Sequence, residues 1–259
     1  MVIGRLAFPL LAVLLGAQQG ASVIRRGPYV QRVDAKSALV CFETSAETEG
    51  AVECGGKVYR SPRGKRHEVQ LKGLEPGARI RYVVQPGGLA GIFRTAPVKP
   101  DAEVAFIALG DTRSDHDKFR KIAAKATEDL PDFTLHTGDL VNNGEDDGQW
   151  DQFFKAAQPL LATGSFWPAL GNHERQASQY FSLFALPEGE RWYTFVYGPA
   201  QFFVLDSTGD LSRQATWLKA ELAKSKARYK VRRVPSCGVC LLAGEQSAGG
   251  GEGNLPGLG

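Results

Sequence analysis

The sequence predicts an all-β sandwich followed by a layered α/β domain. Three observations lead to this prediction. Residues 26–97 contain short strand-like runs separated by clusters of Gly, Pro and Ser, which is the pattern of a β-sandwich. Residues 103–227 alternate apolar strands with amphipathic helices, which indicates stacked layers of sheet and helix. Three strands of this second region end in turns that combine Gly with Asp, Asn or His.

The segment before the first strand, residues 1–22, has the pattern of a secretory signal peptide. Arg5 supplies a positive charge, residues 6–17 are apolar, and small and polar residues follow. The apolar stretch is too short for a comfortable membrane span, and no later segment is long and apolar enough to be one. We expect cleavage between Ala17 and Ser22 and a secreted or periplasmic mature protein without a transmembrane span.

The charge of the chain argues against a nucleic-acid partner. Lys and Arg number 31 against 28 Asp and Glu, which gives a formal net charge of +3 over 259 residues. The basic residues are scattered, and the densest group, residues 63–67, is interpreted as a solvated hairpin tip. No nucleic acid is therefore expected as a partner.

The predicted sandwich spans residues 23–97. Leu74, Pro76 and Tyr82 resemble the turn and tyrosine corner of a fibronectin type III-like domain. This resemblance concerns the fold and carries no information about chemistry.

Two cysteines of the predicted sandwich raise the question of a disulfide. Cys41 and Cys54 lie in neighbouring predicted strands, and export would make a bridge between them possible. The sequence leaves their pairing open, because a disulfide depends on the distance between the two residues in space.

The predicted α/β domain spans residues 98–230 and begins within a Pro-containing linker, residues 96–103. The expected strands lie within residues 102–111, 133–139, 166–172 and 201–208. The expected helices lie within residues 117–130, 148–161 and 212–227. In the first of these helices the residues expected on one apolar face are Phe119, Ile122, Ala126 and Leu130.

Three of the expected strands end in turns suited to holding metal ions. The turns carry Asp111, Asp139, and the pair Asn172 and His173, each preceded by a Gly that lets the backbone turn sharply. Sites in α/β folds lie at the carboxyl ends of strands, and carboxylate and amide oxygens suit divalent metals. One such turn is weak evidence, because an Asp after a strand is usually a cap or turn residue. All three in order, 28 and then 33 residues apart, form a specific pattern.

At these turns the sequence resembles the calcineurin-like metallophosphoesterases, and specifically the purple acid phosphatase-like branch, which also carries an N-terminal fibronectin-like sandwich. The resemblance runs from Arg26 to Lys230. It implies an αββα fold and two metal ions, divalent or of mixed valence, drawn from Fe, Zn and Mn. It implies that Asp111 binds the first metal, that Asp139 bridges both and that Asn172 binds the second.

The resemblance also implies a reaction. The family hydrolyses phosphate mono- or diesters, so a phosphate ester is the expected substrate. Two metals about 3.5–4 Å apart can hold the attacking and leaving oxygens, and a metal-bound water ionises near neutral pH. His173 would face the substrate, as a proton donor to the leaving group or as a stabiliser of phosphoryl charge.

The sequence departs from the family pattern in two places. Arg113 stands where the family often has a His, and Asn142 stands where purple acid phosphatases have a metal-binding Tyr. Arg113 is therefore a candidate for holding a phosphate oxygen, with a surface ion pair as the alternative. Asn143, Glu174 and Arg175 are candidates for substrate or supporting contacts, against the simpler interpretation that they hold their own loops.

The family's remaining histidine ligands are expected after residue 230, but no His follows His173. Residues 231–259 are rich in Gly and are predicted to be a non-native or disordered tail, which makes the α/β domain C-terminally incomplete. A frameshift near Val231 is one explanation, because allowed codons read one base later give Val-Val-Phe-His-His. The alternative is a divergent, flexible C-terminus.

Two functions remain open from the sequence. The first is a metal-dependent, acid phosphatase-like phosphoesterase, impaired by loss of the C-terminal His ligands. The second is a catalytically inactive fragment or an exported binding protein whose sandwich mediates contacts. A third function, an exported adhesion module, is disfavoured by the ordered turns. The exact substrate, the identity of the metals and the oligomeric state are not determined by the sequence.

Overall fold

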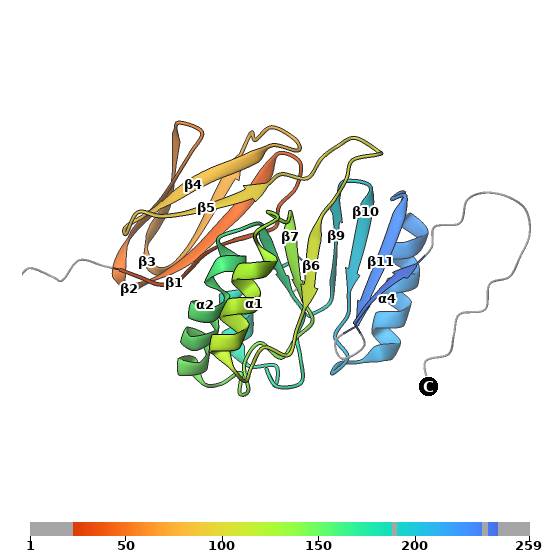
Figure 1. Ribbon diagram of the computed structural model, residues 1–259. Helices are drawn as coiled ribbons and strands as arrows, with labels where there is room; N and C mark the ends of the chain where they lie inside the picture. Colours follow the sequence, from red (N-terminus) through yellow and green to blue (C-terminus); the bar gives the residue numbers. More distant parts are fainter. Residues whose placement is uncertain (1–22, 188–190, 235–237, 243–259) are drawn as a thin grey trace, which may run out of the picture.

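The computed structural model describes residues 23–187, 191–234 and 238–242 (Figure 1). The predicted signal peptide, residues 1–22, lies outside the described residues, as does the greater part of the predicted tail, residues 243–259. None of the helices in the described ranges is long and apolar enough to cross a membrane.

Strands and helices follow the order that the sequence predicts, with strands first and mixed elements after them. The strands are β1 (Ile24–Gln31), β2 (Ser37–Cys54), β3 (Lys57–Lys72), β4 (Arg79–Gln85), β5 (Leu89–Arg94), β6 (Phe106–Leu109), β7 (Phe133–His136), β8 (Ser165–Pro168), β9 (Tyr193–Tyr197), β10 (Ala200–Val204), β11 (Tyr229–Val234) and β12 (Gly238–Leu242). The helices are α1 (His116–Ala126), α2 (Asp147–Leu161), α3 (Ser178–Leu183) and α4 (Leu211–Lys224).

The N-terminal strands form a sheet that bends back on itself. The first half of β2 pairs with β1 and its last four residues pair with β4, while β3 runs along β2 on the other side. The change of partner follows an irregular register between Glu43 and Thr48. Because β2 bends there, β5 lies over β1, as Figure 1 shows, and apolar side chains fill the space between the two halves.

Two details of the N-terminal region differ from the sequence prediction. Residues 55–64 contain one of the clusters of Gly, Pro and Ser that separate the predicted strands, but residues 57–64 belong to the long strand β3, and the turn before it is only Gly55 and Gly56, both with positive φ. Cys41 and Cys54 lie in the same strand rather than in neighbouring ones, and both are free thiols. A strand rises roughly 3.3 Å per residue, so the two thiols are too far apart to pair.

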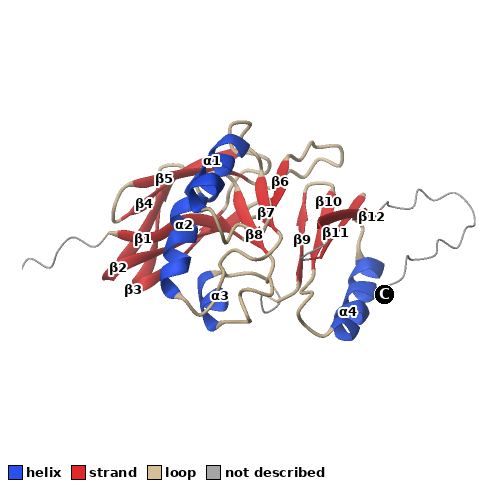
Figure 2. Cartoon of the chain, turned by 60° about the horizontal axis from the view of Figure 1, so that its bottom comes forward, coloured by secondary structure: helices blue, strands red, loops and turns tan. Residues whose placement is uncertain are grey.

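The α/β region has the four layers that the resemblance implies. β6, β7 and β8 are parallel and continue the N-terminal sheet through β1, giving the order β5-β4-β2-β1-β8-β7-β6. A second sheet, in the order β12-β11-β10-β9, packs against this one. Helices α1 and α2 cover the outer face of the first sheet and α4 that of the second (Figure 2). The prediction of an αββα arrangement is confirmed.

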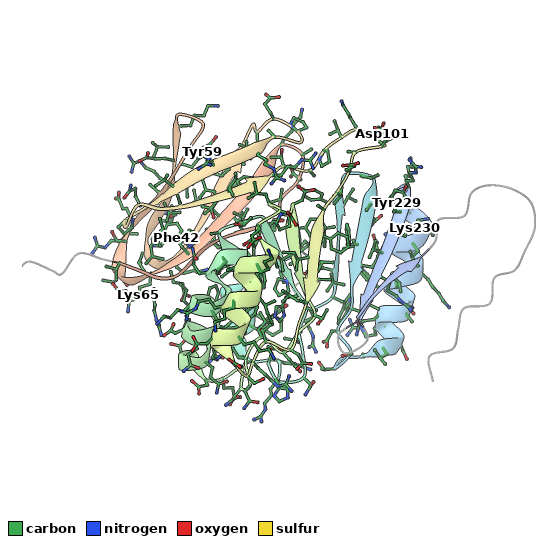
Figure 3. The ribbon with its side chains drawn as sticks, viewed as in Figure 1. Phe42, Tyr59, Lys65, Asp101, Tyr229 and Lys230 are labelled. Carbon is green, nitrogen blue, oxygen red and sulfur yellow. The ribbon has the colours of Figure 1, made fainter. Side chains whose placement is uncertain are left out.

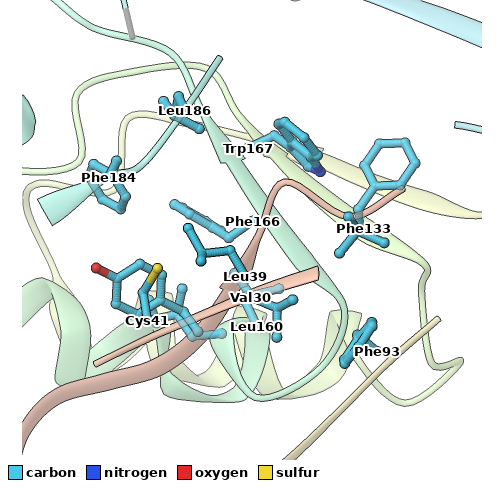
Figure 4. Packing of buried hydrophobic residues seen from close by; sticks show 14 of the residues in the cluster. Val30, Leu39, Cys41, Phe93, Phe133, Leu160, Phe166, Trp167, Phe184 and Leu186 are labelled. Carbon is cyan, nitrogen blue, oxygen red and sulfur yellow. The ribbon is translucent and has the colours of Figure 1, made fainter. Parts of the chain in front are cut away.

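The two regions share one apolar core. Figure 4 shows Val30 and Cys41 from the N-terminal strands in the same cluster as Phe166 and Trp167 from β8. Between the two sheets, the ring of Trp167 stacks on that of Phe195 with a centroid distance of 3.8 Å. The rigid framework behind the strand ends is therefore built from both regions.

The flank of the molecule at β6 differs from the prediction of a buried strand. β6 pairs with β7 alone among the described strands, and its Phe106 is 37% exposed. On the neighbouring helix α1, Phe119 is buried as predicted, but Ile122 is 50% exposed. In the second sheet, β11 continues past the predicted boundary at residue 230 and pairs along its length with β10.

Candidate functional site

The three predicted turns meet at the carboxyl ends of β6, β7 and β8. The amide of Asp111 donates to the carbonyl of Gly138 at 3.1 Å, which ties the first turn to the second. The amide of His173 donates to Oδ1 of Asp139 at 3.1 Å, which ties the third turn to the second. The structure thus brings Asp111, Asp139 and His173 together, as the order of parallel strands predicts.

Left-handed backbone conformations are concentrated in these turns. Asp111 and Asp139 have φ values of 58° and 55°, and Arg175 and Gln176 have values of 50° and 56°. Residues other than Gly adopt this conformation at a cost, and such residues cluster at functional sites. In both Asp turns this conformation comes within three residues of the end of a strand, where the chain turns away from the sheet.

The second and third turns touch through their backbones. A Cβ atom added to Gly171 would lie 2.3 Å from both the amide nitrogen and Oδ1 of Asp139, and one added to Gly138 would lie 2.8 Å from Cα of Gly171. Only glycine permits this approach. The Gly residues of the predicted turn pattern are therefore explained by the packing of one turn on another.

The buried carboxylate of Glu174 links these two turns through hydrogen bonds. Its Oε1 accepts hydrogen bonds from the amides of Leu140 and Val141, at 2.7 and 3.2 Å. Its Oε2 accepts from the amides of Asp139 and Gly171, at 3.0 and 2.7 Å. The side chain is fully buried, and burial raises the pKa of its carboxyl group, against the effect of these amide donors. The simpler interpretation of Glu174, that it holds its loops, is confirmed.

Arg113 contacts both carboxylates of the site. Its Nη1 forms an ion pair with Oδ1 of Asp111 and a second one, of 3.2 Å, with Oδ2 of Asp139. The Arg113 side chain is 28% exposed, so the guanidinium lies at the surface of the site rather than in solution. The position that the family often gives to a His thus holds a permanent positive charge between the two carboxylates.

The remaining predicted site residues have different surroundings. Asn172 is exposed at the strand end. Nδ1 of His173 lies 3.0 Å from the carbonyl oxygen of Asn142, so this nitrogen carries a proton and Nε2 is directed elsewhere. The Asn143 side chain accepts a hydrogen bond from the amide of Glu145 at 3.3 Å, which is a contact within its own loop.

Two further side chains, those of His136 and Thr112, contact each other beside the site. His136 is buried and packs against the rings of Phe119 and Phe166. Its Nε2 lies 2.9 Å from Oγ1 of Thr112, a residue that sequence reasoning did not select. No motif marks Thr112, and its place beside Asp111 is the only signal in the sequence.

A small cavity of about 310 Å³ opens beside the first turn. Its lining includes Asp111, Thr112 and Lys118, so a carboxylate and a cationic residue both border it. A larger cavity of about 700 Å³ lies at the other end of β6, where its lining includes Asp101 and Tyr229 (Figure 3). The three turns follow the carboxyl ends of β6, β7 and β8, and the smaller cavity lies at that same end. The smaller cavity therefore belongs to the candidate site.

The residues of the site fit a single metal ion better than a pair. The oxygens of Asp111, Asp139 and Asn172 are of the type that a hard divalent cation prefers. In the described part of the chain no group of three or more His, Cys, Asp or Glu side chains is placed to hold a metal. The nitrogens of His136 and His173 closest to the turns already contact Thr112 and Asn142. Among the described residues, the carboxylates of Asp111 and Asp139 are the oxygens that a common contact brings together, and no second set of ligands accompanies them.

Comparisons with known proteins agree with this geometry. The family model described as calcineurin-like phosphoesterase matches residues 104–229. A probable inactive purple acid phosphatase 1 of Arabidopsis thaliana is 26% identical over 194 residues, which cover 59% of this chain and 32% of that protein. A probable inactive purple acid phosphatase 24 of the same plant is 32% identical over 99 residues, which cover 30% and 16%.

Solved structures match over most of the chain. The purple acid phosphatase PPD1 from seeds of yellow lupin, Lupinus luteus, superposes with a TM-score of 0.66 at 18% identity, covering 82% of this chain and 50% of that one. PhoD superposes with a TM-score of 0.60 at 16% identity, covering 82% and 61%. The chain therefore carries a calcineurin-like phosphoesterase domain. The fold of the chain, including the N-terminal strands, is that of purple acid phosphatases. The matched part of the chain spans about a third or less of the length of the curated relatives.

Proposed function

We propose that this chain binds phosphate esters and hydrolyses them by a metal-dependent reaction, and that its hydrolysis is impaired. The observation that supports the proposal is the meeting of Asp111, Asp139 and His173 at three strand ends within a phosphoesterase domain. In this proposal Asp111, Asp139 and Asn172 hold a divalent ion. Such an ion lowers the pKa of a water molecule and neutralises phosphoryl charge.

His173 and Arg113 act on the phosphate ester itself in this proposal. The His173 ring is oriented by the contact of its Nδ1 with the Asn142 carbonyl, which leaves Nε2 for the substrate. Because Nδ1 is already a donor, His173 gives a proton to the leaving group only when both ring nitrogens are protonated. Arg113 donates two hydrogen bonds to phosphate oxygens in this proposal, once its Nη1 is released from Asp111 and Asp139.

The impairment follows from the limited set of metal ligands. The oxygens of the three turns suit one ion, whereas a two-metal reaction needs a second set of ligands and the residues that orient them. The two Arabidopsis relatives are named as probable inactive enzymes. A phosphate-ester-binding protein without turnover is therefore the second candidate function, and the predicted signal peptide would direct either one out of the cytoplasm.

Hydrolysis of p-nitrophenyl phosphate and bis(p-nitrophenyl) phosphate by the full chain tests the proposal. We expect slow turnover with Mn²⁺, none with a chelator and none in Asp139→Asn. Asp117→Asn is the control, because within the described ranges Asp117 forms a single, exposed ion pair, with Arg120 on α1. Phosphate binding without turnover at any Mn²⁺ concentration would favour the second candidate, and the absence of both would contradict the proposal.

A further inference from the structure

We propose that Arg113 is a built-in cation that competes with a divalent metal ion for the carboxylates of Asp111 and Asp139. The proposal rests on the proposed function, since it concerns how the same site acquires its metal. It assigns to Arg113 a role in metal binding in addition to any contact with phosphate.

The first step concerns the two oxygens of the Asp139 carboxylate and their partners. Its Oδ2 pairs with Nη1 of Arg113 at 3.2 Å, and its Oδ1 accepts the amide of His173 at 3.1 Å. Its side chain is only 16% exposed. Both oxygens of this partly buried carboxylate are thus engaged by the protein itself.

The second step concerns charge. Asp111 and Asp139 end neighbouring strands, and two carboxylates in such proximity repel each other unless a cation lies between them. Nη1 of Arg113 contacts one oxygen of each, and a guanidinium keeps its charge at every accessible pH. Arg113 therefore already provides the neutralisation that a metal ion would otherwise provide.

The third step concerns space. Ca²⁺ and Mg²⁺ bind carboxylate oxygens at about 2.0–2.6 Å, and transition metals at similar distances. A metal ion at that distance from Oδ1 of Asp111 and Oδ2 of Asp139 would meet Nη1 of Arg113, which contacts the same two atoms. Metal binding therefore requires Arg113 to move away from at least one of the two carboxylates.

This displacement would couple metal loading to substrate binding. While Arg113 pairs with the two carboxylates, its Nη1 is not available to a phosphate. A metal ion that displaces it would free the guanidinium beside the cavity that Asp111 and Lys118 line. The site would thus gain its metal and its phosphate contact in one rearrangement of a single side chain.

Mn²⁺ titration calorimetry on the full-length chain tests the proposal with Arg113→Met, which keeps the length of the side chain and removes its charge. We expect Arg113→Met to bind Mn²⁺ at least about tenfold more tightly than the parent, because a competing positive charge is gone. Arg120→Met is the matched control, since among the described residues Arg120 pairs with Asp117 alone, on the exposed face of α1, and it should bind as the parent does.

Melting temperatures give a second measurement that does not depend on activity. In a chelator, Arg113→Met should melt below the parent, because its two carboxylates are left without a cation. Addition of Mn²⁺ should raise the melting temperature of Arg113→Met by more than it raises that of the parent. The melting temperature of Arg113→Lys should be close to that of the parent in both conditions, because Lys retains the positive charge.

The outcomes separate this proposal from the proposed function. Equal or weaker Mn²⁺ binding by Arg113→Met overturns the competition, even where the parent hydrolyses phosphate esters. Tighter Mn²⁺ binding by Arg113→Met supports the competition, even where neither protein hydrolyses anything. Absence of Mn²⁺ binding in both proteins overturns the competition and the metal-dependent function together.

Discussion

Glu174 is the residue on which the relative position of the second and third turns depends most. Its two oxygens accept four backbone amides within 3.2 Å, and no solvent reaches it. Glu174→Gln replaces one acceptor oxygen by an NH₂ group that faces amide donors. We expect a loss of about 2–4 kcal/mol in the free energy of unfolding, because buried donors are left without acceptors. Urea unfolding measures this loss.

The control for this variant is Glu145→Gln, in the same loop region but exposed. It should change the free energy of unfolding by less than about 0.5 kcal/mol. A Glu174→Gln protein as stable as this control would mean that the turns are held by other contacts.

His67 carries a pH dependence of stability within the N-terminal strands. It is fully buried, and its ring nitrogens lie 2.8 Å from Oγ of Ser61 and 3.2 Å from Oγ1 of Thr44. Burial lowers its pKa from the usual value of 6.5. Between the folded pKa and 6.5 the unfolded chain binds more protons than the folded one, so the free energy of unfolding falls as the pH falls through this window.

His67→Gln isolates this contribution, because Gln retains hydrogen-bonding groups but does not titrate. Urea unfolding between about pH 7.5 and about pH 5 should show a decline for the parent protein that is smaller in the variant. The difference between the two curves should become constant above about pH 7.5, where the His of the unfolded chain is also deprotonated. Parallel curves over the whole range would exclude His67 as the source.

At the scale of secondary-structure elements, the packing of the turn after β8 on the turn after β7 sets the shape of the site. Gly171→Ala would place a Cβ 2.3 Å from the Asp139 amide, so the two turns must separate. We expect a loss of at least about 2 kcal/mol in stability and loss of Mn²⁺ binding. Gly64→Ala is the control, since its Cβ would meet only the Arg66 carbonyl at 3.6 Å. Calorimetric titration with Mn²⁺ and thermal unfolding provide the two measurements.

The elements that the sequence predicts well are those with long regular patterns. Helices α1, α2 and α4 lie within two residues of their expected starts, because an Asp caps each of them and their apolar residues repeat at helical spacing. The strand β9 was not predicted, although it pairs with β10 along its length and its Tyr193, Phe195 and Tyr197 are buried. Short apolar runs give a weak signal, because strand and loop differ little in four or five residues.

The partial exposure of β6 shows a second limit of prediction from the sequence. Its apolar sequence predicts a buried strand, but burial depends on whether a second strand lies along its other edge. In the described residues that edge has no partner, so Phe106 is exposed. The site has the same limit: the sequence predicts that three turns converge, but it does not predict which atoms meet. The ion pairs of Arg113 and the hydrogen bond of Thr112 follow from side-chain geometry alone.

At the scale of the whole molecule, the N-terminal strands and the α/β region are joined by more than the linker. Val30 of β1 pairs with Ser165 of β8, and Arg94 of β5 forms an ion pair of 3.2 Å with the buried Asp132. Arg26 of β1 binds Asp147 and Asp151 of α2, both at 2.6 Å, and is only 4% exposed. These contacts predict that the two regions unfold as one unit.

The junction at Arg26 permits a test with a matched control, because the neighbouring Arg25 binds the same two carboxylates from an exposed position. Arg26→Met should lower the free energy of unfolding by about 1–3 kcal/mol, since it removes the hydrogen bonds of a buried guanidinium to Glu43, Asp147 and Asp151. Arg25→Met should cost less than about 1 kcal/mol. The four Trp residues all lie at or after position 150, so their fluorescence reports on the α/β region. Labelling of the buried Cys41 thiol reports on the N-terminal strands. In the parent both signals should change at one urea concentration, and two separate transitions would show that the regions are independent.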